Sequence, residues 1–380
     1  MSRLSLWAAR VERQRVTLPV VHLIAAARPN FMKVAPLHHA LAAAGWCRPQ
    51  LVHTGQHYDA NMSDAFLRDL GLPEPAHHLE VGSGSHAEQT GRTMIAYEAV
   101  CRSASPAAIV VVGDVNATVA CALVGAKLWI PVVHLEAGLR SGDRRMPEEI
   151  NRLVTDAVAD LLWTPSRDAD ANLRAEGVPA AKIECVGNIM LDSFELLRER
   201  ISAADTRARL KLDGPYAVVT LHRPSNVDDR TQLEALVGAL VALSQELTVV
   251  FAVHPRTRKR LAEFGLASRI AAAPAIRTCG PLSYIDFMSL VMHCTIALTD
   301  SGGVQEETTY LGIPCGTLRE NTERPITLTE GTNRLVSAAT LLSSAREALA
   351  GQWPRGRRPE LWDGHAAGRA ADSLRRRLRG

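Results

Sequence analysis

Acidic, basic and imidazole side chains gather where the apolar runs of this sequence end, or in the segment that follows. A single member has a plain structural explanation, since an aspartate after a strand often caps the next helix and glutamates are favoured at a helix start. Their occurrence together needs a further explanation, because a cluster of charges is costly unless its members are paired or have a function. Carboxylates beside histidines can move protons, and guanidinium groups can hold phosphate oxygens. The members are Arg28, Lys33, His57, Asp114, Glu136, Glu148, Arg152, His222, His254, Glu307 and Arg324.

A separate group of residues indicates phosphate binding. Asp300, Ser301, Gly302 and Gly303 stand where an apolar run gives way to a helical stretch. Glycines let a ligand approach the backbone closely, and the free N–H groups of a helix start attract anions. Ser301 adds a hydroxyl donor, and Arg28 adds a guanidinium that can hold two phosphate oxygens. The sequence therefore predicts a diphosphate site that uses this segment.

The motifs that the sequence lacks narrow the chemistry further. It has no G-x-x-x-x-G-K-[ST] and no G-x-G-x-x-G after its first apolar run, so kinase and nicotinamide dehydrogenase interpretations lose their phosphate-binding element. It has no H-E-x-x-H and no clustered Cys/His spacing, so we expect no metal and no cofactor. Glu307 is placed to accept hydrogen bonds from a ribose, or is a plain acid of the helix surface. The set suits acid–base chemistry on a nucleotide sugar.

Apolar runs alternate with helical stretches, and this alternation predicts the elements that position the polar residues. The runs are continuously apolar, which is typical of parallel strands covered on both faces. Their repetition predicts an α/β fold with two doubly wound Rossmann-like domains facing a cleft, lined by the carboxyl ends of the strands. The predicted strands are residues 19–26, 50–55, 108–114, 131–137, 161–166 and 182–187, followed by 216–222, 247–255, 275–280, 295–300 and 313–318.

The strand pattern restarts after Gly214, and a charged, polar stretch before it marks a domain boundary. We predict an N-terminal extension over residues 1–18, an N-terminal domain over 19–205 and a C-terminal domain over 206–360. A C-terminal helix over 361–380 completes the chain, with the first domain as its expected packing partner. The first eighteen residues hold four arginines but no apolar core of a secretory signal.

Composition excludes several classes of protein. The 380 residues are 47% hydrophobic and 22% charged, with a net charge of +3, which excludes a disordered chain and a protein built to coat nucleic acid. No apolar run approaches the length of a membrane span. The seven cysteines include no C-x-x-C pair, which favours reduced thiols and a cytoplasmic location.

Eight segments, in this order, make the chain similar to the bacterial non-hydrolysing UDP-N-acetylglucosamine 2-epimerases. Each segment is modest alone, but their order is specific, and together they extend from about Val21 to Val336. They read ARPNFMKVAPL (27–37), TGQHYD (54–59), GDVNAT (113–118), HLEAGLR (134–140), PEEINR (147–152), TLHRP (220–224), DSGGVQEE (300–307) and RENTERP (319–325).

This resemblance implies a glycosyltransferase-B-like fold, interconversion of UDP-GlcNAc and UDP-ManNAc without a cofactor, and a homodimer. It also implies roles, with the C-terminal domain binding UDP. Asp114, Glu136, Glu148 and His222 match the catalytic residues. The residues expected to bind substrate are Arg28 and Lys33 near the diphosphate, Ser301, Gly302 and Gly303 on it, Glu307 on the ribose, Arg324 near the site, and His57, Arg152 and His254 around it.

The resemblance further implies an elimination mechanism, in which UDP leaves as a base takes the C2 proton and then adds back after protonation from the other face. The sequence does not say which residue is acid and which is base. Three alternatives stay open: a hydrolysing 2-epimerase that releases ManNAc and UDP, a glycosyltransferase on the same scaffold, and a nucleotide-sugar sensor without activity. Carboxylates beside a diphosphate speak against the sensor.

Overall fold

The computed structural model describes residues 18–55 and 67–379, apart from the side chain of Arg28. The chain divides into two compact units, which we describe separately. The first contains residues up to Leu196 together with residues 360–380, and the second contains residues 197–359. The division lies inside helix α8 (Ile189–Ser202), ahead of the boundary at residues 205/206 that the sequence predicts.

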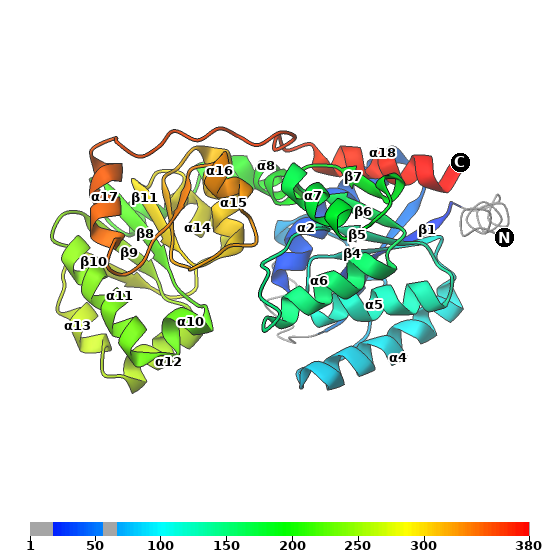
Figure 1. Ribbon diagram of the computed structural model, residues 1–380, viewed down its shortest axis with the longest axis horizontal. Coiled ribbons are helices and arrows are strands. Elements are labelled where there is room, and N and C mark those ends of the chain that lie inside the picture. Colours follow the sequence, from blue (N-terminus) through cyan, green and yellow to red (C-terminus); the bar gives the residue numbers. More distant parts are fainter. Residues whose placement is uncertain (1–17, 56–66, 380) are drawn as a thin grey trace. The chain divides into compact units, whose positions relative to one another are not determined.

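A parallel sheet forms the centre of the first unit, as Figure 1 shows. Its strand order is β3-β2-β1-β4-β5-β6-β7, so the chain runs outward from β1 in one direction and from β4 in the other. Ligands of open α/β sheets bind where the strand order reverses, which here is the carboxyl end of β1 and β4. The strands are β1 (Val20–Ala25), β2 (Arg48–His53), β3 (His77–His78), β4 (Ala108–Val112), β5 (Val132–Leu135), β6 (Leu161–Thr164) and β7 (Ile183–Cys185).

Helices cover this sheet, and the last helix of the chain belongs to them. The C-terminal helix packs against the helix that follows β1. Trp163 of β6 donates a hydrogen bond to Ser373 on it at 2.9 Å, which links the first segment of the unit to its C-terminal segment. Besides α8, the helices are α2 (Arg28–Ala44), α4 (His86–Ala104), α5 (Asn116–Lys127), α6 (Pro147–Val158), α7 (Arg167–Ala175), the 3₁₀ turn η1 (Ala180–Lys182) and α18 (Ala366–Arg379).

The second unit repeats the plan with strand order β10-β9-β8-β11-β12-β13, and its order reverses between β8 and β11. Val219, Phe251 and Leu298 lie fully buried in its core. The strands are β8 (Tyr216–Thr220), β9 (Thr248–Ala252), β10 (Ile276–Cys279), β11 (Ile296–Thr299), β12 (Cys315–Thr317) and β13 (Asn333–Leu335). The helices are α9 (Thr206–Arg209), α10 (Pro224–Val227), α11 (Arg230–Leu243), α12 (Pro255–Glu263), α13 (Ala267–Ala271), α14 (Tyr284–Val291), α15 (Gly302–Leu311), α16 (Ile326–Thr329) and α17 (Leu341–Leu349).

The predicted α/β class, with two doubly wound parallel sheets, is confirmed. Each predicted strand is present and two to four residues shorter than its apolar run, except β2, which has the same length but begins two residues earlier. The sequence analysis missed β3 and β13, which are two and three residues long and lie at sheet edges. A short edge strand lacks a long run of apolar residues, because it forms by pairing with the neighbouring strand and is not buried on both faces.

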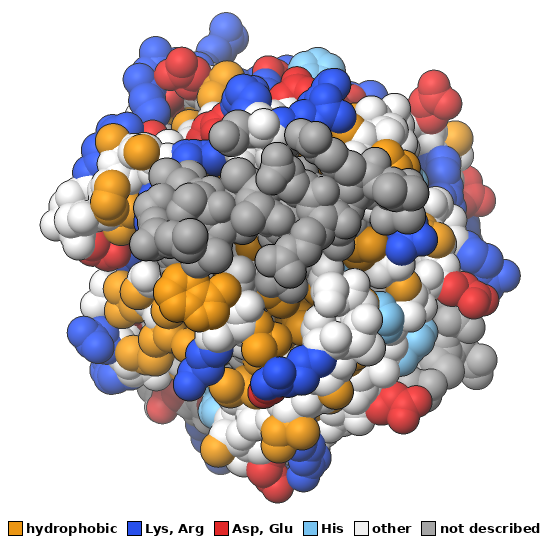
Figure 2. All heavy atoms as spheres, turned by 90° about the vertical axis from the view of Figure 1, so that its right-hand side faces the viewer, with side chains coloured by type: hydrophobic (Ala, Val, Ile, Leu, Met, Phe, Trp, Pro, Cys, Tyr) orange, Lys and Arg blue, Asp and Glu red, His pale blue; other side chains and the backbone are white. Residues whose placement is uncertain are grey.

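Charges of both signs are mixed on the face that Figure 2 shows, where Lys, Arg, Asp and Glu side chains are scattered around the margin and hydrophobic side chains gather below the centre. A nucleic-acid-binding face would instead be dominated by one basic patch. Among the described residues, none of the helices combines the length and the apolar character that crossing a membrane requires.

Acid is expected to destabilise the first unit through His22 on β1. This side chain is fully buried, and burial, reinforced by nearby His77, lowers its pKa to about 4. The unfolded chain takes up the proton near pH 6.5, so the folded state loses stability as the pH falls from about 6.5 towards 4. The expected loss between pH 7 and pH 4 is about 3 kcal/mol from this residue. Urea unfolding at the two pH values measures it.

The variant His22→Asn tests this assignment, because asparagine does not titrate but keeps a polar atom near the Tyr97 hydroxyl, 3.0 Å from His22 Nδ1. This variant should lose most of the destabilisation between pH 7 and pH 4 that the titration of His22 causes. His293→Asn, at an exposed position, serves as the matched control. An unchanged pH dependence in His22→Asn would show that other groups govern acid unfolding.

Candidate active site

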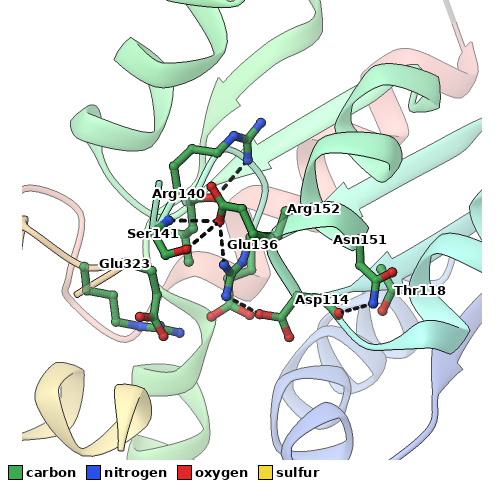
Figure 3. Close-up of polar contacts among 12 residues, drawn as sticks. Asp114, Thr118, Glu136, Arg140, Ser141, Asn151, Arg152 and Glu323 are labelled. Carbon is green, nitrogen blue, oxygen red and sulfur yellow. Dashed lines mark hydrogen bonds and ion pairs between the residues drawn. The ribbon is translucent and has the colours of Figure 1, made fainter. Parts of the chain in front are cut away.

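Asp114 lies in the turn after β4, at the point where the strand order of the first sheet reverses. Its carboxylate accepts a hydrogen bond from Arg152 on α6, and its backbone carbonyl accepts one from the Asn151 side chain at 2.8 Å (Figure 3). The carboxylate is 30% exposed, while the arginine is almost fully buried. Asp114 is therefore bound on its buried side by the Arg152 guanidinium, and its carboxylate is partly exposed to solvent.

Glu149 orients that cation. Its carboxylate accepts a hydrogen bond from Arg152 Nη1 at 3.0 Å, and also from the backbone N–H groups of Ser141 at 2.9 Å and Gly142 at 3.1 Å. Burial would raise the pKa of Glu149, but these donors outweigh it and hold the pKa below its usual value. The carboxylate stays ionised, so Arg152 sits between two negative partners in a fixed position.

Glu136, after β5, supplies a further carboxylate to the same edge. It forms an ion pair with Lys33 of α2, and both side chains are largely buried. A Cβ added to Gly113 would lie 3.4 Å from Glu136 Oε2 and 3.6 Å from Lys33 Nζ, so the ion pair lies directly against the turn that carries Asp114. Glu136 has φ +73°, a conformation that costs energy for a residue with a side chain and that clusters at functional sites.

A deeper layer of polar groups supports this edge. His134 on β5 lies between Asp156 of α6, at 2.6 Å from Nδ1, and the Gly113 carbonyl, at 2.8 Å from Nε2. Asp156 also binds Arg140 Nη2 at 2.8 Å. Burial would raise the pKa of Asp156, but His134 and Arg140 hold it below its usual value. These contacts fix the turn that presents Asp114.

In the second unit, His222 follows β8 and lies beside Asp300, which follows β11. Asp300 is fully buried and accepts hydrogen bonds from the backbone N–H of His222 at 3.0 Å and of Arg223 at 2.9 Å. His222 Nδ1 lies 2.8 Å from Asp300 Oδ1. Burial would raise the pKa of Asp300, but these contacts, with one from Asn226, hold it low. The carboxylate therefore fixes the imidazole ring with Nδ1 inward.

The neighbouring strand end brings a second imidazole to this place. The rings of His222 and His254 lie 5.6 Å apart between centroids. His254 caps α12 by accepting the backbone N–H of Arg256 at 3.2 Å. Burial, together with the neighbouring His222 ring, lowers the pKa of His254. A neutral ring at this position adds polarity beside His222 without adding charge.

The start of α15 follows Asp300 directly, with Ser301 as its N-cap. The Ser301 hydroxyl makes no capping hydrogen bond to the helix. A Cβ on Gly302 would lie 2.7 Å from Arg324 Nη1, whereas one on Gly303 would meet no atom of the described chain within 4 Å. Gly302 therefore makes room for an arginine, and Gly303 leaves the helix start open to a ligand.

Three arginines and two buried glutamates surround this helix start. Arg324 contacts Glu306 of α15 and Glu323, the latter at 2.9 Å. Arg223 and Arg319 contact Glu323 at 3.2 and 2.7 Å. Burial would raise the pKa of Glu323, but the guanidinium groups lower it strongly. Together with the buried carboxylate of Asp300, which directly precedes the helix, these glutamates balance the three arginines, so the helix N-terminus itself supplies the attraction for an anion.

Glu307 lies one turn further along α15. It is almost fully buried, and burial raises its pKa to about 8. The Tyr284 hydroxyl donates a hydrogen bond to Glu307 Oε1 at 2.6 Å. This hydrogen bond fixes the orientation of the carboxyl group, as is needed in a group that accepts hydrogen bonds from ligand hydroxyls.

The predicted site residues fall into groups in the structure. Asp114 contacts Arg152, Glu136 contacts Lys33, His222 lies beside His254, and Arg324 lies against Gly302. Glu148 stands exposed at the start of α6, and the buried carboxylate of that turn is Glu149. His57 and the side chain of Arg28 lie outside the described residues.

The sequence analysis assigned no positioning role to several residues that hold these groups in place. One signal for them was present: positions 149, 152 and 156 recur at the helical spacing of one face, and that face is buried. For the others, the contact depends on which strands become neighbours, which no local spacing reveals. These residues are His134, Glu149, Arg223, Asp300, Glu306, Arg319 and Glu323, which lie in the segments quoted above, and Asp156, which lies outside them.

Comparison with known proteins places these features in a family. The model of the UDP-N-acetylglucosamine 2-epimerase family matches residues 39–375. A UDP-N-acetylglucosamine 2-epimerase of Methanocaldococcus jannaschii is 41% identical over 323 residues, 83% of this chain and 87% of that protein. A UDP-2,3-diacetamido-2,3-dideoxy-D-glucuronate 2-epimerase of Pseudomonas aeruginosa is 40% identical over 331 residues, 86% of this chain and 91% of that protein.

Solved structures agree with this result. The crystal structure of the Methanocaldococcus jannaschii UDP-GlcNAc 2-epimerase in complex with UDP-GlcNAc and UDP is similar with a TM-score of 0.85 and 37% sequence identity. The match covers 94% of this chain and 99% of that one.

Proposed function

This chain belongs to the UDP-N-acetylglucosamine 2-epimerase family, and on that premise we propose that it interconverts UDP-N-acetylglucosamine and UDP-N-acetylmannosamine, as supply for surface polysaccharide synthesis. One observation carries the proposal. At the switch point of the second sheet, an open helix start flanked by arginines lies next to His222, whose ring Asp300 orients. A site of this kind can hold a diphosphate while a neighbouring imidazole transfers a proton.

The proposed mechanism is elimination followed by re-addition. The hydrogen at C2 is not α to a carbonyl, so its direct removal as a proton is very slow. A base instead takes the C2 proton while the C1–O bond breaks, and UDP leaves with that electron pair. This gives 2-acetamidoglucal. Protonation at C2 from the opposite face, with re-addition of UDP at C1, then gives the epimer. The sugar's oxidation state is unchanged overall, so no net oxidant or reductant is consumed.

In this mechanism each group of residues has a distinct role. The start of α15 and the arginines around it stabilise the charge that grows on the departing diphosphate, which is usually a large contribution to catalysis. Glu307 accepts hydrogen bonds from the ribose hydroxyls. Asp114, Glu136, Glu148 and His222 supply the acid and base. Arg28, Lys33, His57, Arg152, His254 and Arg324 complete substrate binding.

The direct test is to incubate the purified protein with UDP-GlcNAc and follow the sugar C2 epimers by NMR. We expect a stable mixture of two UDP sugars with only traces of free UDP. Stoichiometric release of UDP and ManNAc would favour the hydrolysing alternative. Conversion only in the presence of a sugar acceptor would favour a glycosyltransferase. UDP-2,3-diacetamido-2,3-dideoxy-glucuronate belongs in the same panel, because a relative that is 40% identical carries that name.

A pair of glycine variants tests the diphosphate site. Gly303→Ala adds a methyl group where the described chain has no atom within 4 Å, so folding should be unaffected. UDP, approaching the helix start, should bind about 10-fold more weakly, as expected for the loss of one hydrogen bond to a charged group. Gly214→Ala is the matched control, because Gly214 lies in the same unit before β8, has no left-handed backbone conformation, and likewise has no described atom within 4 Å of an added Cβ. Isothermal titration with UDP measures the effect, and equal affinities in Gly303→Ala and wild type would remove this helix start from the site.

We further propose a homodimer and a cytoplasmic location. The free thiols of all seven cysteines suit a reducing compartment, which supports the location.

A further inference from the structure

Helix α4 begins at the same sheet edge as the turn that carries Asp114. It follows β3, and α5 follows β4, so both helices start at the carboxyl end of a parallel strand. The two helices pack together, with His86 as the first residue of α4 and Asn116 as the first residue of α5. His86 is exposed, whereas Asn116 is buried. The helix starts therefore bring an exposed imidazole to the edge that holds Asp114.

A chain of amide groups joins this imidazole to the turn of Asp114. Asn151 Nδ2 donates a hydrogen bond to the Asp114 carbonyl at 2.8 Å (Figure 3) and one to Asn116 Oδ1 at 3.3 Å. Asn116 Nδ2 in turn donates to Gln89 Oε1 at 2.8 Å and lies 3.1 Å from His86 Nδ1. The amides of Asn116 and Gln89 are both buried. The His86 ring is thus tied to the backbone of Asp114 through two asparagine side chains.

This chain determines which ring nitrogen of His86 carries the hydrogen. One amide hydrogen of Asn116 is donated to Gln89, and the second faces His86 Nδ1. A neutral imidazole that accepts at Nδ1 carries its hydrogen on Nε2. This tautomer leaves neither amide hydrogen of Asn116 without an acceptor. Among the described residues, none makes a hydrogen bond to Nε2 of His86, so its N–H is a fixed donor that is open to a ligand.

A tie between the two helices does not account for the position of this ring. The hydrogen bond between Asn116 and Gln89 already joins α5 to α4 without it. Buried amides are costly unless their hydrogen bonds are made, and here two of them orient a single exposed side chain. A donor that is held so firmly beside Asp114 is suited to fix one atom of a substrate.

We propose that His86 Nε2 donates a hydrogen bond to the substituent on C3 of the sugar, which is a hydroxyl group in UDP-N-acetylglucosamine. This inference rests on the proposed function, in which Asp114 acts at C2 of the sugar. The ring neighbours of C2 are C1, whose diphosphate is bound by the start of α15, and C3. A donor beside Asp114 that does not belong to the diphosphate site is therefore assigned to C3.

The stereochemistry of the reaction favours C3 over the acetamido group of C2. Epimerisation moves that acetamido group from one face of the ring to the other, so a fixed donor cannot hold it in both epimers. The configuration at C3 is the same in both epimers and in 2-acetamidoglucal. A donor to C3 can therefore hold the sugar before elimination, during it and after re-addition of UDP.

Kinetics with the 3-deoxy analogue of UDP-GlcNAc test the contact. In His86→Ala, kcat/KM for UDP-GlcNAc should fall about 10-fold, as expected for the loss of one hydrogen bond. With the analogue, which has no oxygen on C3, the variant should stay within about twofold of wild type. His365→Ala is the matched control, because His365 is also exposed and directly precedes a helix of the first unit, α18. It should equal wild type on both substrates.

The outcomes separate this inference from the proposed function. Equal losses on both substrates in His86→Ala would show that the residue only supports the fold, and a wild-type rate on both would remove it from the site. Either result overturns the contact while epimerisation by wild type leaves the proposed function standing. A wild-type protein that epimerises neither substrate overturns both.

Nitrogen NMR of the imidazole rings in wild type, in alkaline buffer, tests the tautomer independently of activity. The signals of His86 are those that disappear in His86→Ala. We expect them to show a hydrogen on Nε2 and an accepting Nδ1, because the Asn116 amide faces Nδ1. A ring with its hydrogen on Nδ1 would overturn the proposed donor.

Discussion

Replacing Asp114 by asparagine is expected to lower kcat at least about 10²-fold with little change in KM. Asparagine has nearly the shape of aspartate and still offers an oxygen to Arg152, so the turn after β4 and its hydrogen bond from Asn151 should survive. What it loses is the negative charge and the ability to take a proton. Steady-state kinetics on UDP-GlcNAc, with a thermal melt of the same sample, measure the effect.

Asp363→Asn provides the matched control for this variant, because Asp363 is another aspartate of the first unit held by an arginine, Arg369, at 2.8 Å. Its kinetics should equal those of wild type. A near-normal kcat in Asp114→Asn would remove Asp114 from the catalytic residues. A raised KM with unchanged kcat would leave it a role in binding alone.

Replacing His222 by alanine is expected to lower kcat by at least a similar factor, about 10²-fold or more. The ring is fixed by Asp300 and lies next to the start of α15, so it is placed to act on a sugar whose diphosphate is held there. UDP should still bind, since the helix start and its arginines are untouched. Activity assays and UDP titration on the same variant separate the two functions.

His293→Ala, at an exposed position of the second unit, is the control for His222→Ala. Asp300→Asn adds a finer test, because an amide cannot accept from the ring and from two backbone N–H groups as the carboxylate does. It should lower kcat while the ring itself remains. Wild-type rates in His222→Ala would mean that the carboxylates of the first unit perform the proton transfers without it.

The sequence predicts the sheets well because burial on both faces imposes one clear pattern. The run from Ala108 to Val112 contains only apolar residues and forms a fully buried central strand. β3 consists of His77 and His78, which carry no such pattern, and only the neighbouring strand β2 makes them a strand. The boundary between the units could not be located to the residue either, because α8 runs through it without a break.

The strand-end residues of the site were predictable for a similar reason: parallel strands bring their carboxyl ends to one edge. The residues that hold them were not. Glu148 and Glu149 are adjacent and chemically identical, and only the phase of α6 decides that Glu149 turns inward to Arg152. Asp300 belongs to a recognisable segment, but its role toward His222 depends on β8 and β11 being neighbours. Local spacing does not contain that information.

The central claim is that the C2–H bond breaks while UDP leaves and returns. Turnover of UDP-GlcNAc in D₂O, followed by NMR and mass spectrometry of the product, tests it most directly. We predict one deuterium at C2 of the UDP-ManNAc formed, with traces of free UDP and 2-acetamidoglucal that escape during turnover. A product that fully retains the original hydrogen at C2 would contradict the claim, because an elimination that loses the proton to a side chain exchanging with solvent cannot preserve it.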